Sequence, residues 1–201
     1  QLGERPRNAT VVTTTGGGGA MVIDELNIRG VEIKGLSKVS KRFFKDKKIP
    51  HGSGKLVDVT LAGTQYDTMK SLIGQLIADK ETGLIVVAIG SSAQFNPELA
   101  VKPIIDAVRE NPDGAQVVAF PLPIAAQSIS MLEAADIPCF ASVESCGDSV
   151  SLFLREPNEY TENVQEKEQK LFIDCNHVQA SLSSLKIGKE GGMLNEVDSN
   201  K

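Results

Sequence analysis

The chain has 201 residues, of which 41% are hydrophobic and 23% charged, and its formal net charge is −5 at pH 7. This composition is typical of a globular protein with one full core and an extension. The negative charge argues against nucleic acid or an anionic membrane as the main partner, and no apolar run is long enough to cross a bilayer. Without a signal segment at its start, the chain is expected to be cytoplasmic.

The first half of the chain alternates predicted strands with predicted helices. The β-branched run 10–15 predicts a strand, the four glycines 16–19 a loop, and residues from 20 onward a helix. A strand at 31–36, a helix at 38–46 and a strand at 56–61 follow. Helical spacing of apolar residues predicts a helix at 66–78. The aliphatic run 84–89 is typical of a parallel strand buried on both faces.

The second half continues this alternation. Asn96 is the predicted N-cap of a helix from Pro97 to about Glu110, in which Pro103 is expected to cause a kink or a break. Further predictions are a strand at 116–120, a helix at 125–135, an edge strand at 137–141 and a helix at 143–154. Such alternation indicates right-handed βαβ units and a parallel sheet.

The predicted fold is therefore α/β, a doubly wound parallel sheet in a flavodoxin-like three-layer sandwich. Its five core strands, numbered along the chain, are expected in the order 2-1-3-4-5. This domain spans residues 1–156. Residues 157–201 are predicted to be a polar extension or linker, because they show no second core.

The glycine run is the strongest chemical signal in the chain. Backbone N–H groups and the positive end of a helix dipole would face one point there, where a phosphate would fit. The run matches neither a Walker loop, because Ala20 and Met21 follow it, nor a dinucleotide fingerprint, whose third glycine would fall at Met21 or Val22. The alternative is a tight turn in which glycine serves only close packing.

Small residues also follow the third and fourth predicted strands, at the sheet edge where the winding direction should reverse. Hydroxyl groups from this edge would add donors to those of the backbone. Asp58 would either position a ligand or stiffen its loop. The predicted phosphate-binding residues are Thr14, Thr15, Gly16, Gly17, Gly18 and Gly19, and the predicted lining residues are Asp58, Leu61, Ala62, Gly63, Ser91, Ser92, Ala93 and Gln94.

No catalytic apparatus or metal cluster is visible in the sequence. His51 has no identifiable carboxylate partner and precedes its strand, and His177 lies in the polar extension, so neither is assigned a catalytic role. The three cysteines, Cys139, Cys146 and Cys175, show no zinc-type spacing and are interpreted as free thiols in a reducing compartment.

Residues 5–20, 57–63 and 91–100 carry a family resemblance. Together they resemble the succinyl-CoA-synthetase-like flavodoxin domain of nucleoside-diphosphate-forming acyl-CoA synthetases (acid-CoA ligases), which precedes an ATP-grasp domain. The resemblance covers about residues 5–156. Residues 194–199 are similar to the lead-in to an ATP-grasp domain.

This resemblance implies a reversible reaction in which an acyl-CoA, phosphate and ADP or GDP give the acid, CoA and ATP or GTP through a phosphohistidine. It implies that CoA, ATP or ADP, phosphate and Mg²⁺ serve the full enzyme, with no cofactor held by this chain. Gly16 to Gly19 would supply one of two helix N-termini that face the phosphohistidine.

The resemblance places that histidine on another domain, in a His-Thr-Gly or His-Ala-Gly context that His51 does not match. The implied partners are CoA-binding and ATP-grasp domains or subunits, with a possible homo-oligomer. The identity of the acid is not implied. The alternative is a non-catalytic flavodoxin-like binding or assembly module.

Overall fold

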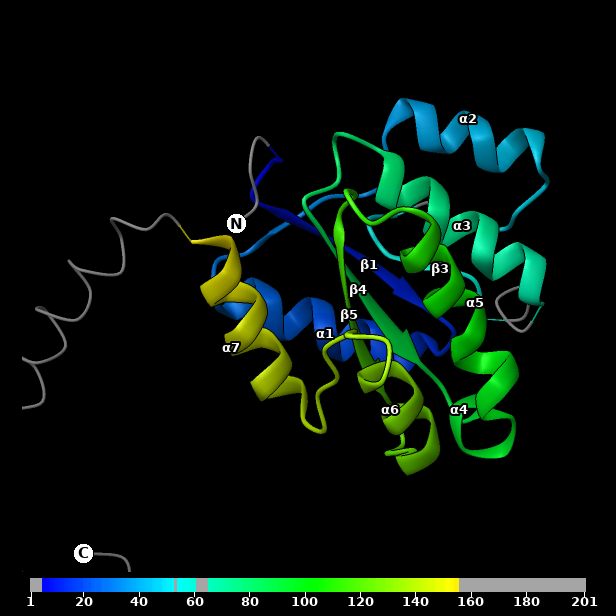
Figure 1. Ribbon diagram of the computed structural model, residues 1–201. Helices are drawn as coiled ribbons and strands as arrows, with labels where there is room; N and C mark the ends of the chain where they lie inside the picture. The colour runs from blue at the N-terminus through cyan, green and yellow to red at the C-terminus, as the bar shows by residue number, and fades with distance from the viewer. Residues whose placement is uncertain (1–4, 53, 61–64, 156–201) are drawn as a thin grey trace, which may run out of the picture. The chain divides into compact units, whose positions relative to one another are not determined.

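The computed structural model describes residues 5–52, 54–60 and 65–155 (Figure 1). Its strands are β1 (Asn8–Thr13), β2 (Glu32–Ile33), β3 (Val57–Asp58), β4 (Leu84–Ile89) and β5 (Gln116–Pro121). Its helices are α1 (Gly16–Ile28), α2 (Lys38–Asp46), α3 (Tyr66–Ala78), α4 (Ser92–Phe95), α5 (Pro97–Glu110), α6 (Ala126–Glu133) and α7 (Val143–Leu154). Among the described residues, no helix is long and apolar enough to cross a membrane.

All strand pairs are parallel, and the sheet follows the path β2-β1-β4-β5. β4 pairs with β1 along residues 9–13, so β2 and β3 share the other edge of β1. β2 pairs with Asn8 and Ala9, whereas β3 pairs with Val12 and Thr13. The prediction that the third strand lies between the first and fourth is therefore wrong.

The flavodoxin-like arrangement nevertheless holds, because β2 and β3 together fill one strand position. A single parallel bridge between Ala119 and Cys139 lies beyond β5 in place of the predicted edge strand 137–141. The amide N–H of Ala119 donates to Pro138 O (2.8 Å), and that of Phe140 donates to Ala119 O (3.1 Å). The predicted α/β class and doubly wound sheet are confirmed.

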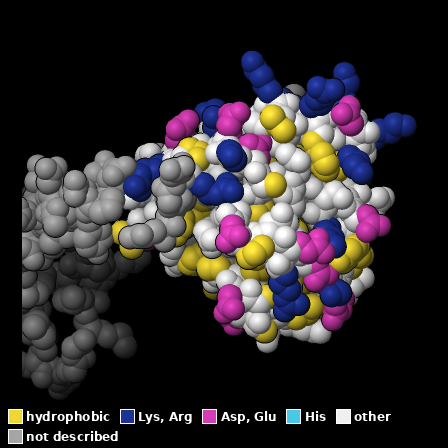
Figure 2. All heavy atoms as spheres, turned by 45° about the horizontal axis from the view of Figure 1, so that its top comes forward, with side chains coloured by type: hydrophobic (Ala, Val, Ile, Leu, Met, Phe, Trp, Pro, Cys, Tyr) yellow, Lys and Arg dark blue, Asp and Glu magenta, His cyan; other side chains and the backbone are white. Residues whose placement is uncertain are grey.

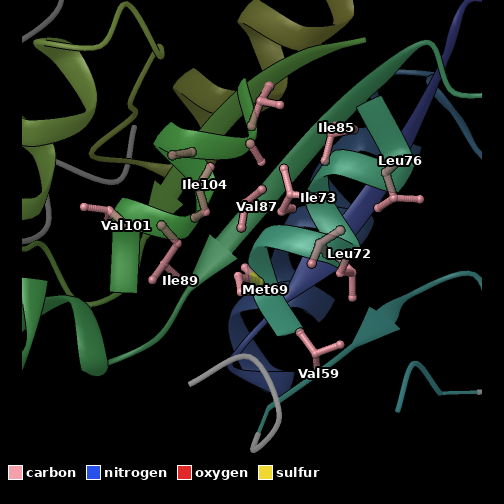
Figure 3. Packing of buried hydrophobic residues seen from close by; sticks show 14 of the residues in the cluster. Val59, Met69, Leu72, Ile73, Leu76, Ile85, Val87, Ile89, Val101 and Ile104 are labelled. Carbon is pink, nitrogen blue, oxygen red and sulfur yellow. The ribbon is translucent and has the colours of Figure 1, made fainter. Parts of the chain in front are cut away.

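Helices cover both faces of the sheet, which completes the three layers (Figure 1). Because successive strand residues point to opposite faces, Ile85 and Val87 pack against α3 and α5, as Figure 3 shows. Val86 and Ala88 instead pack in the cluster formed with α1 and α7. All six residues of β4 are buried, as the continuous aliphatic run predicts.

The bounds of α2, α3, β4 and α7 agree with the sequence predictions, whereas β2 and β3 are shorter than predicted. A Cβ on Gly35 would lie 3.3 Å from Gly54 O, so the chain after β2 passes close against the segment that leads to β3. Of the kink or break predicted at Pro103, the break is absent, since α5 runs unbroken through this residue and buries it. Asn96 caps α5 by accepting from Leu99 N–H (3.4 Å), as predicted.

A buried carboxylate fixes the start of α2 against the end of α3. The Asp79 side chain accepts hydrogen bonds from the hydroxyls of Ser37 and Ser40 and from Glu81 N–H (3.0 Å). The Arg5 guanidinium donates to three carbonyl oxygens of the same turn, at Ile77, Asp79 and Thr82 (3.0–3.1 Å). This network joins three segments of the chain at the end of the sheet opposite the loops that follow the strands.

We expect Asp79→Asn to lower the free energy of unfolding at pH 7 by about 1–3 kcal/mol, because it removes the charged acceptor. Burial would raise the Asp79 pKa, but hydrogen bonds from Ser37, Ser40 and Glu81, together with the nearby charge of Lys34, lower it overall. The ionised carboxylate thus stabilises the fold above the pKa of the unfolded chain, and this contribution is lost as the pH falls through the folded pKa.

Urea unfolding of both proteins at pH 7 and pH 3 measures this effect. The difference between wild type and variant should shrink in acid. An equal difference at the two pH values would contradict the role given to the ionised carboxylate.

Candidate functional site

The winding direction of the sheet reverses between β1 and β4, because β2 and β3 lie on one side of β1 and β4 on the other. The loops that follow these two strands are in direct contact. Thr14 N–H donates to Ala88 O (3.0 Å), and Gly90 N–H donates to Thr14 Oγ1 (2.9 Å). A Cβ on Gly90 would lie 3.1 Å from Thr15 Cβ. The sheet thus brings the glycine run and the Ser91 segment together, as a ligand site at a switch point requires.

The four glycines form the first turn of α1, whereas the sequence predicts a loop before it. Helix α1 begins at Gly16 with Thr15 as its extended N-cap residue. Gly19 N–H donates to Thr15 O (3.0 Å), which closes the first turn of the helix. The amide N–H groups that precede Gly19 in this turn therefore have no acceptor within the helix. The first turn carries no acidic side chain and the Thr15 side chain does not cap it. The positive end of the helix is therefore not neutralised by a side chain of its own first turn.

Close packing explains two of the four glycines. A Cβ on Gly18 would lie 2.8 Å from Thr15 Cγ2, and one on Gly19 would lie 2.8 Å from Thr13 Cβ. Both residues are buried. These two positions need glycine so that the helix can approach the sheet, as the packing interpretation predicts.

The other two glycines have no such packing reason. Gly16 and Gly17 are exposed, a Cβ on Gly17 would meet nothing within 4 Å, and one on Gly16 would meet only Asp58 Oδ2, at 3.8 Å. Their backbone can therefore be approached closely from solvent. The phosphate-facing role of this half of the run stays a prediction.

The hydroxyl groups of Thr13 and Thr14 at this edge have structural partners. The Thr14 oxygen accepts from Gly90 N–H, and the Thr13 hydroxyl donates to Thr15 O (2.6 Å) and accepts from Thr15 N–H (2.9 Å). Sequence reasoning did not single out Thr13. The signal that could have found it is a threonine in the predicted strand that leads into the glycine run. Ser91 is exposed and Ser92 is half-buried.

The segment after β4 continues into the short helix α4, which the sequence did not predict. Ala93 is buried, and its carbonyl accepts from Ser128 Oγ (2.7 Å). The Gln94 side chain donates to Ile124 O (2.9 Å), in the loop after β5. These two predicted lining residues thus connect the segment after β4 to the loop after β5 and to α6.

Asp58 is both a loop-stiffening residue and a neighbour of the glycine turn. Its Oδ1 accepts from Thr60 N–H (2.9 Å) and from the Thr60 hydroxyl, while its Oδ2 faces Gly16. The hydrogen bonds from Thr60 support the loop-stiffening interpretation of Asp58, and its role in positioning a ligand stays a prediction. The predicted lining residues Leu61, Ala62 and Gly63 lie outside the described residues.

The loops of this edge carry almost no charge. Residues 14–23, 90–97 and 121–132 contain no Asp, Glu, Lys or Arg, although 23% of the chain is charged. An anion here would have to be held by backbone amides and hydroxyl groups, without a cationic side chain from these segments. Such a site binds a free dianion weakly unless another molecule encloses it.

Among the described residues, the other histidine and cysteines considered in the sequence lie in packing positions. His51 Nδ1 is 2.9 Å from Ile49 O, and the ring centroids of His51 and Phe44 are 5.7 Å apart. Burial raises the pKa of both the Cys139 and Cys146 thiols to about 12. His177 and Cys175 lie outside the described residues. Within the described part of the chain, no group of three or more His, Cys, Asp or Glu could hold a metal ion.

Comparison with known proteins yields structural neighbours only. No family model and no curated protein sequence matches the chain. Its fold is similar to PH0766 from Pyrococcus horikoshii OT3 (TM-score 0.66, 18% identity), over 76% of this chain and 37% of that one. It is also similar to the dinucleotide forming acetyl-coenzyme A synthetase 1 of Ca. Korarchaeum cryptofilum, in its apo form and in complex with phosphate and ADP.

Both forms of the second neighbour give a TM-score of 0.63 and 18% identity, over 83% of this chain and 36% of theirs. The chain therefore spans little more than a third of the length of these neighbours. The fold implied by the family resemblance is confirmed. The roles of the predicted site residues stay predictions.

We expect the two halves of the glycine run to respond oppositely to an added methyl group. Gly19→Ala should lower the free energy of unfolding by about 1–3 kcal/mol, because its Cβ would clash with Thr13 in a packed position. Gly17→Ala should leave it unchanged or raise it by up to about 1 kcal/mol, because alanine favours the helix and has room. Chemical unfolding measures both. Equal destabilisation by the two changes would mean that packing accounts for the whole run.

Proposed function

We propose that this chain is the flavodoxin-like domain of a nucleoside-diphosphate-forming acyl-CoA synthetase. Its role there is to present the first turn of α1 to the phosphoryl group of a histidine on another domain. The observation that carries the proposal is the open backbone of Gly16 and Gly17 at a helix N-terminus, placed at the switch point of the sheet. The motif resemblance and a structural neighbour named as an acetyl-coenzyme A synthetase support it.

The proposed reaction proceeds through two carriers of the phosphoryl group. Phosphate displaces CoA from the acyl-CoA and forms an acyl phosphate. The histidine then attacks the phosphorus and releases the carboxylate of the acid. ADP or GDP finally takes the phosphoryl group from the histidine, which regenerates the free imidazole. Each step is reversible, and the first-turn amides of α1 would stabilise the phosphoryl oxygens while the histidine carries them.

The single carboxylate beside the glycine turn fits a phosphohistidine better than free phosphate. Asp58 Oδ2 faces Gly16 and would repel a free dianion there. The same carboxylate can accept a hydrogen bond from an imidazole N–H. A phosphohistidine would therefore meet donors from α1 at its phosphoryl group and the Asp58 acceptor at its imidazole N–H.

In this proposal, partner domains or subunits supply the parts of the active site that this chain lacks. CoA, nucleotide and Mg²⁺ would be held by CoA-binding and ATP-grasp domains or subunits, with which this domain forms the complete site. Such an enzyme would act in the cytoplasm, where its substrates are and where free thiols stay reduced.

Histidine phosphorylation in the assembled enzyme tests the proposal. We expect Gly17→Leu to reduce the rate of phosphohistidine formation at least about tenfold, because the new side chain would occupy the space that the phosphoryl group needs. Asn27→Leu, an exposed position near the far end of the same helix, is the control and should leave the rate unchanged. Acid-labile phosphate on the histidine is the measurement. An unchanged rate in Gly17→Leu would favour the non-catalytic module instead.

Inorganic phosphate tests the electrostatics of the turn in this chain alone. We expect weak binding by the wild type and about fivefold tighter binding by Asp58→Asn, because one nearby negative charge is removed. NMR titration of the amides of Gly16 and Gly17 measures it. Asp136→Asn makes the same change of net charge at an exposed residue with φ 57° and should not alter the affinity. Identical affinities for wild type and Asp58→Asn would place the anion elsewhere.

A further inference from the structure

Helix α2 carries a row of positive charges along one exposed side. Four basic residues share this side at the helical spacing i, i+3, i+4 and i+7, namely Lys38, Lys41, Arg42 and Lys45, and all four are exposed. We call these four residues the basic stripe. Lys and Arg side chains gather at the upper right of the molecule in Figure 2, where α2 lies in Figure 1. The buried residues Ser40 and Phe44 place the opposite side of α2 against the domain.

The basic stripe concentrates positive charge on a domain that is otherwise acidic. Residues 38–48 carry six Lys or Arg residues and one Asp, whereas the other described residues carry ten Lys or Arg and fifteen Asp or Glu. Within the described part of the chain, Asp46 is the one carboxylate that forms an ion pair with the stripe, at 3.9 Å from Arg42 Nε, and both side chains are largely exposed. The charges of the three stripe lysines therefore face solvent without an acidic partner from those residues.

This arrangement of charge opposes the stability of the helix. Lysine or arginine residues four positions apart, as at 38 and 42 and at 41 and 45, repel each other and destabilise a helix. The first turn of α2 contains Lys38 and no acidic residue, so a positive charge stands at the positive end of the helix dipole. An exposed helix gains stability when opposite charges occupy such positions instead.

The residue that ends α2 shows the same preference for positive charge over stability. Lys48 has a φ of 55°, and Ile49 N–H donates to Phe44 O (2.8 Å) across it, which is the helix closure that favours glycine or asparagine in the left-handed conformation. A lysine stands there instead, next to the exposed Lys47. Residues that lower stability are typical of functional surfaces, so these features indicate that the positive charge of α2 serves binding.

We propose that the basic stripe is the docking surface for an acidic helix of a partner protein. Charge complementarity identifies this occupant. The stripe is about 10 Å long, and its neighbouring charges lie about 5–6 Å apart, so carboxylates at the same spacing on a second helix would face them one to one. Val39, which is 65% exposed beside the stripe, would supply an apolar contact. This surface is separate from the proposed phosphoryl site, because α2 begins at the end of the sheet opposite the glycine turn, so binding here does not depend on the proposed function.

Other polyanions fit the stripe less well. A nucleic acid or an anionic membrane is larger than one helix face and would extend over the remaining surface, where acidic residues outnumber basic ones and repel it. Membrane insertion would also need exposed aromatic side chains, whereas Phe44 of α2 is fully buried in the core. A narrow acidic helix meets only the stripe.

A synthetic helical peptide with glutamates at positions i, i+3, i+4 and i+7 is the probe for the full chain of 201 residues. We expect it to bind with a Kd below about 0.1 mM at physiological salt, because four complementary charges meet at close range. A peptide of the same composition, with its glutamates distributed around the helix, should bind at least about tenfold more weakly. Fluorescence anisotropy measures the affinities, and NMR of the amides of residues 38–48 locates the site.

Charge reversal within the stripe separates binding from stability. Lys41→Glu should weaken peptide binding at least about tenfold and raise the Tm by about 1–3 °C, because a glutamate at this position attracts Lys45 instead of repelling it. Arg109→Glu makes the same change of charge at an exposed residue of α5 and should leave the affinity unchanged. A lower Tm for Lys41→Glu would mean that the stripe stabilises the fold and would overturn the proposal.

The other occupants give distinguishable results. A wild-type Kd above about 0.1 mM, equal binding of the two peptides, or equal weakening by Lys41→Glu and Arg109→Glu would overturn the acidic helix. Tighter binding of a single-stranded oligonucleotide or of phosphatidylserine vesicles at residues 38–48 would assign the stripe to that polyanion instead. Sedimentation of the chain tests a second copy, because a dimer that Lys41→Glu dissociates would make the stripe a contact between copies.

Discussion

The close approach of the first turn of α1 to the sheet determines the geometry of the whole rim. Gly19 lies against Thr13 of β1 with no space for a side chain, and Gly18 lies equally close to Thr15. This contact holds the start of α1 at the switch point, where the connections after β1 and β4 run in opposite directions along the sheet. The packing of Gly18 and Gly19 consequently places the exposed residues Gly16 and Gly17, which precede them, at the switch point.

Local patterns in the sequence were sufficient for much of this fold. Apolar periodicity predicts the bounds of α3, and the continuous aliphatic run predicts β4, because both signals come from burial within one element. The sequence could not predict with which edge of β1 the strand β3 pairs. Strand pairing is decided by residues that are distant in the chain, and β3 contributes only two residues to the sheet. The helical start at Gly16 was missed because an isolated glycine run does not favour helix, and tertiary packing supplies the stability.

The candidate site was predictable as a set of loops but not as a set of roles. Switch-point reasoning brings Gly17 and Ser91 to one edge, and the structure places their loops in contact. It does not reveal that Thr14 holds Gly90, or that Gln94 reaches across to Ile124. Those contacts depend on side-chain directions that only the assembled sheet defines. The division of the glycines into two buried and two exposed residues likewise follows from the three-dimensional contact.

The shared strand position of β2 and β3 has a consequence for the behaviour of the chain in solution. Each of these strands contributes only two residues to the outer edge of β1, and α2 interrupts them. At the other edge, the bridge at Cys139 occupies part of β5. An edge built from two such short strands offers little template for strand addition by another chain. The β2 and β3 side of the described sheet is therefore protected against edge-to-edge aggregation.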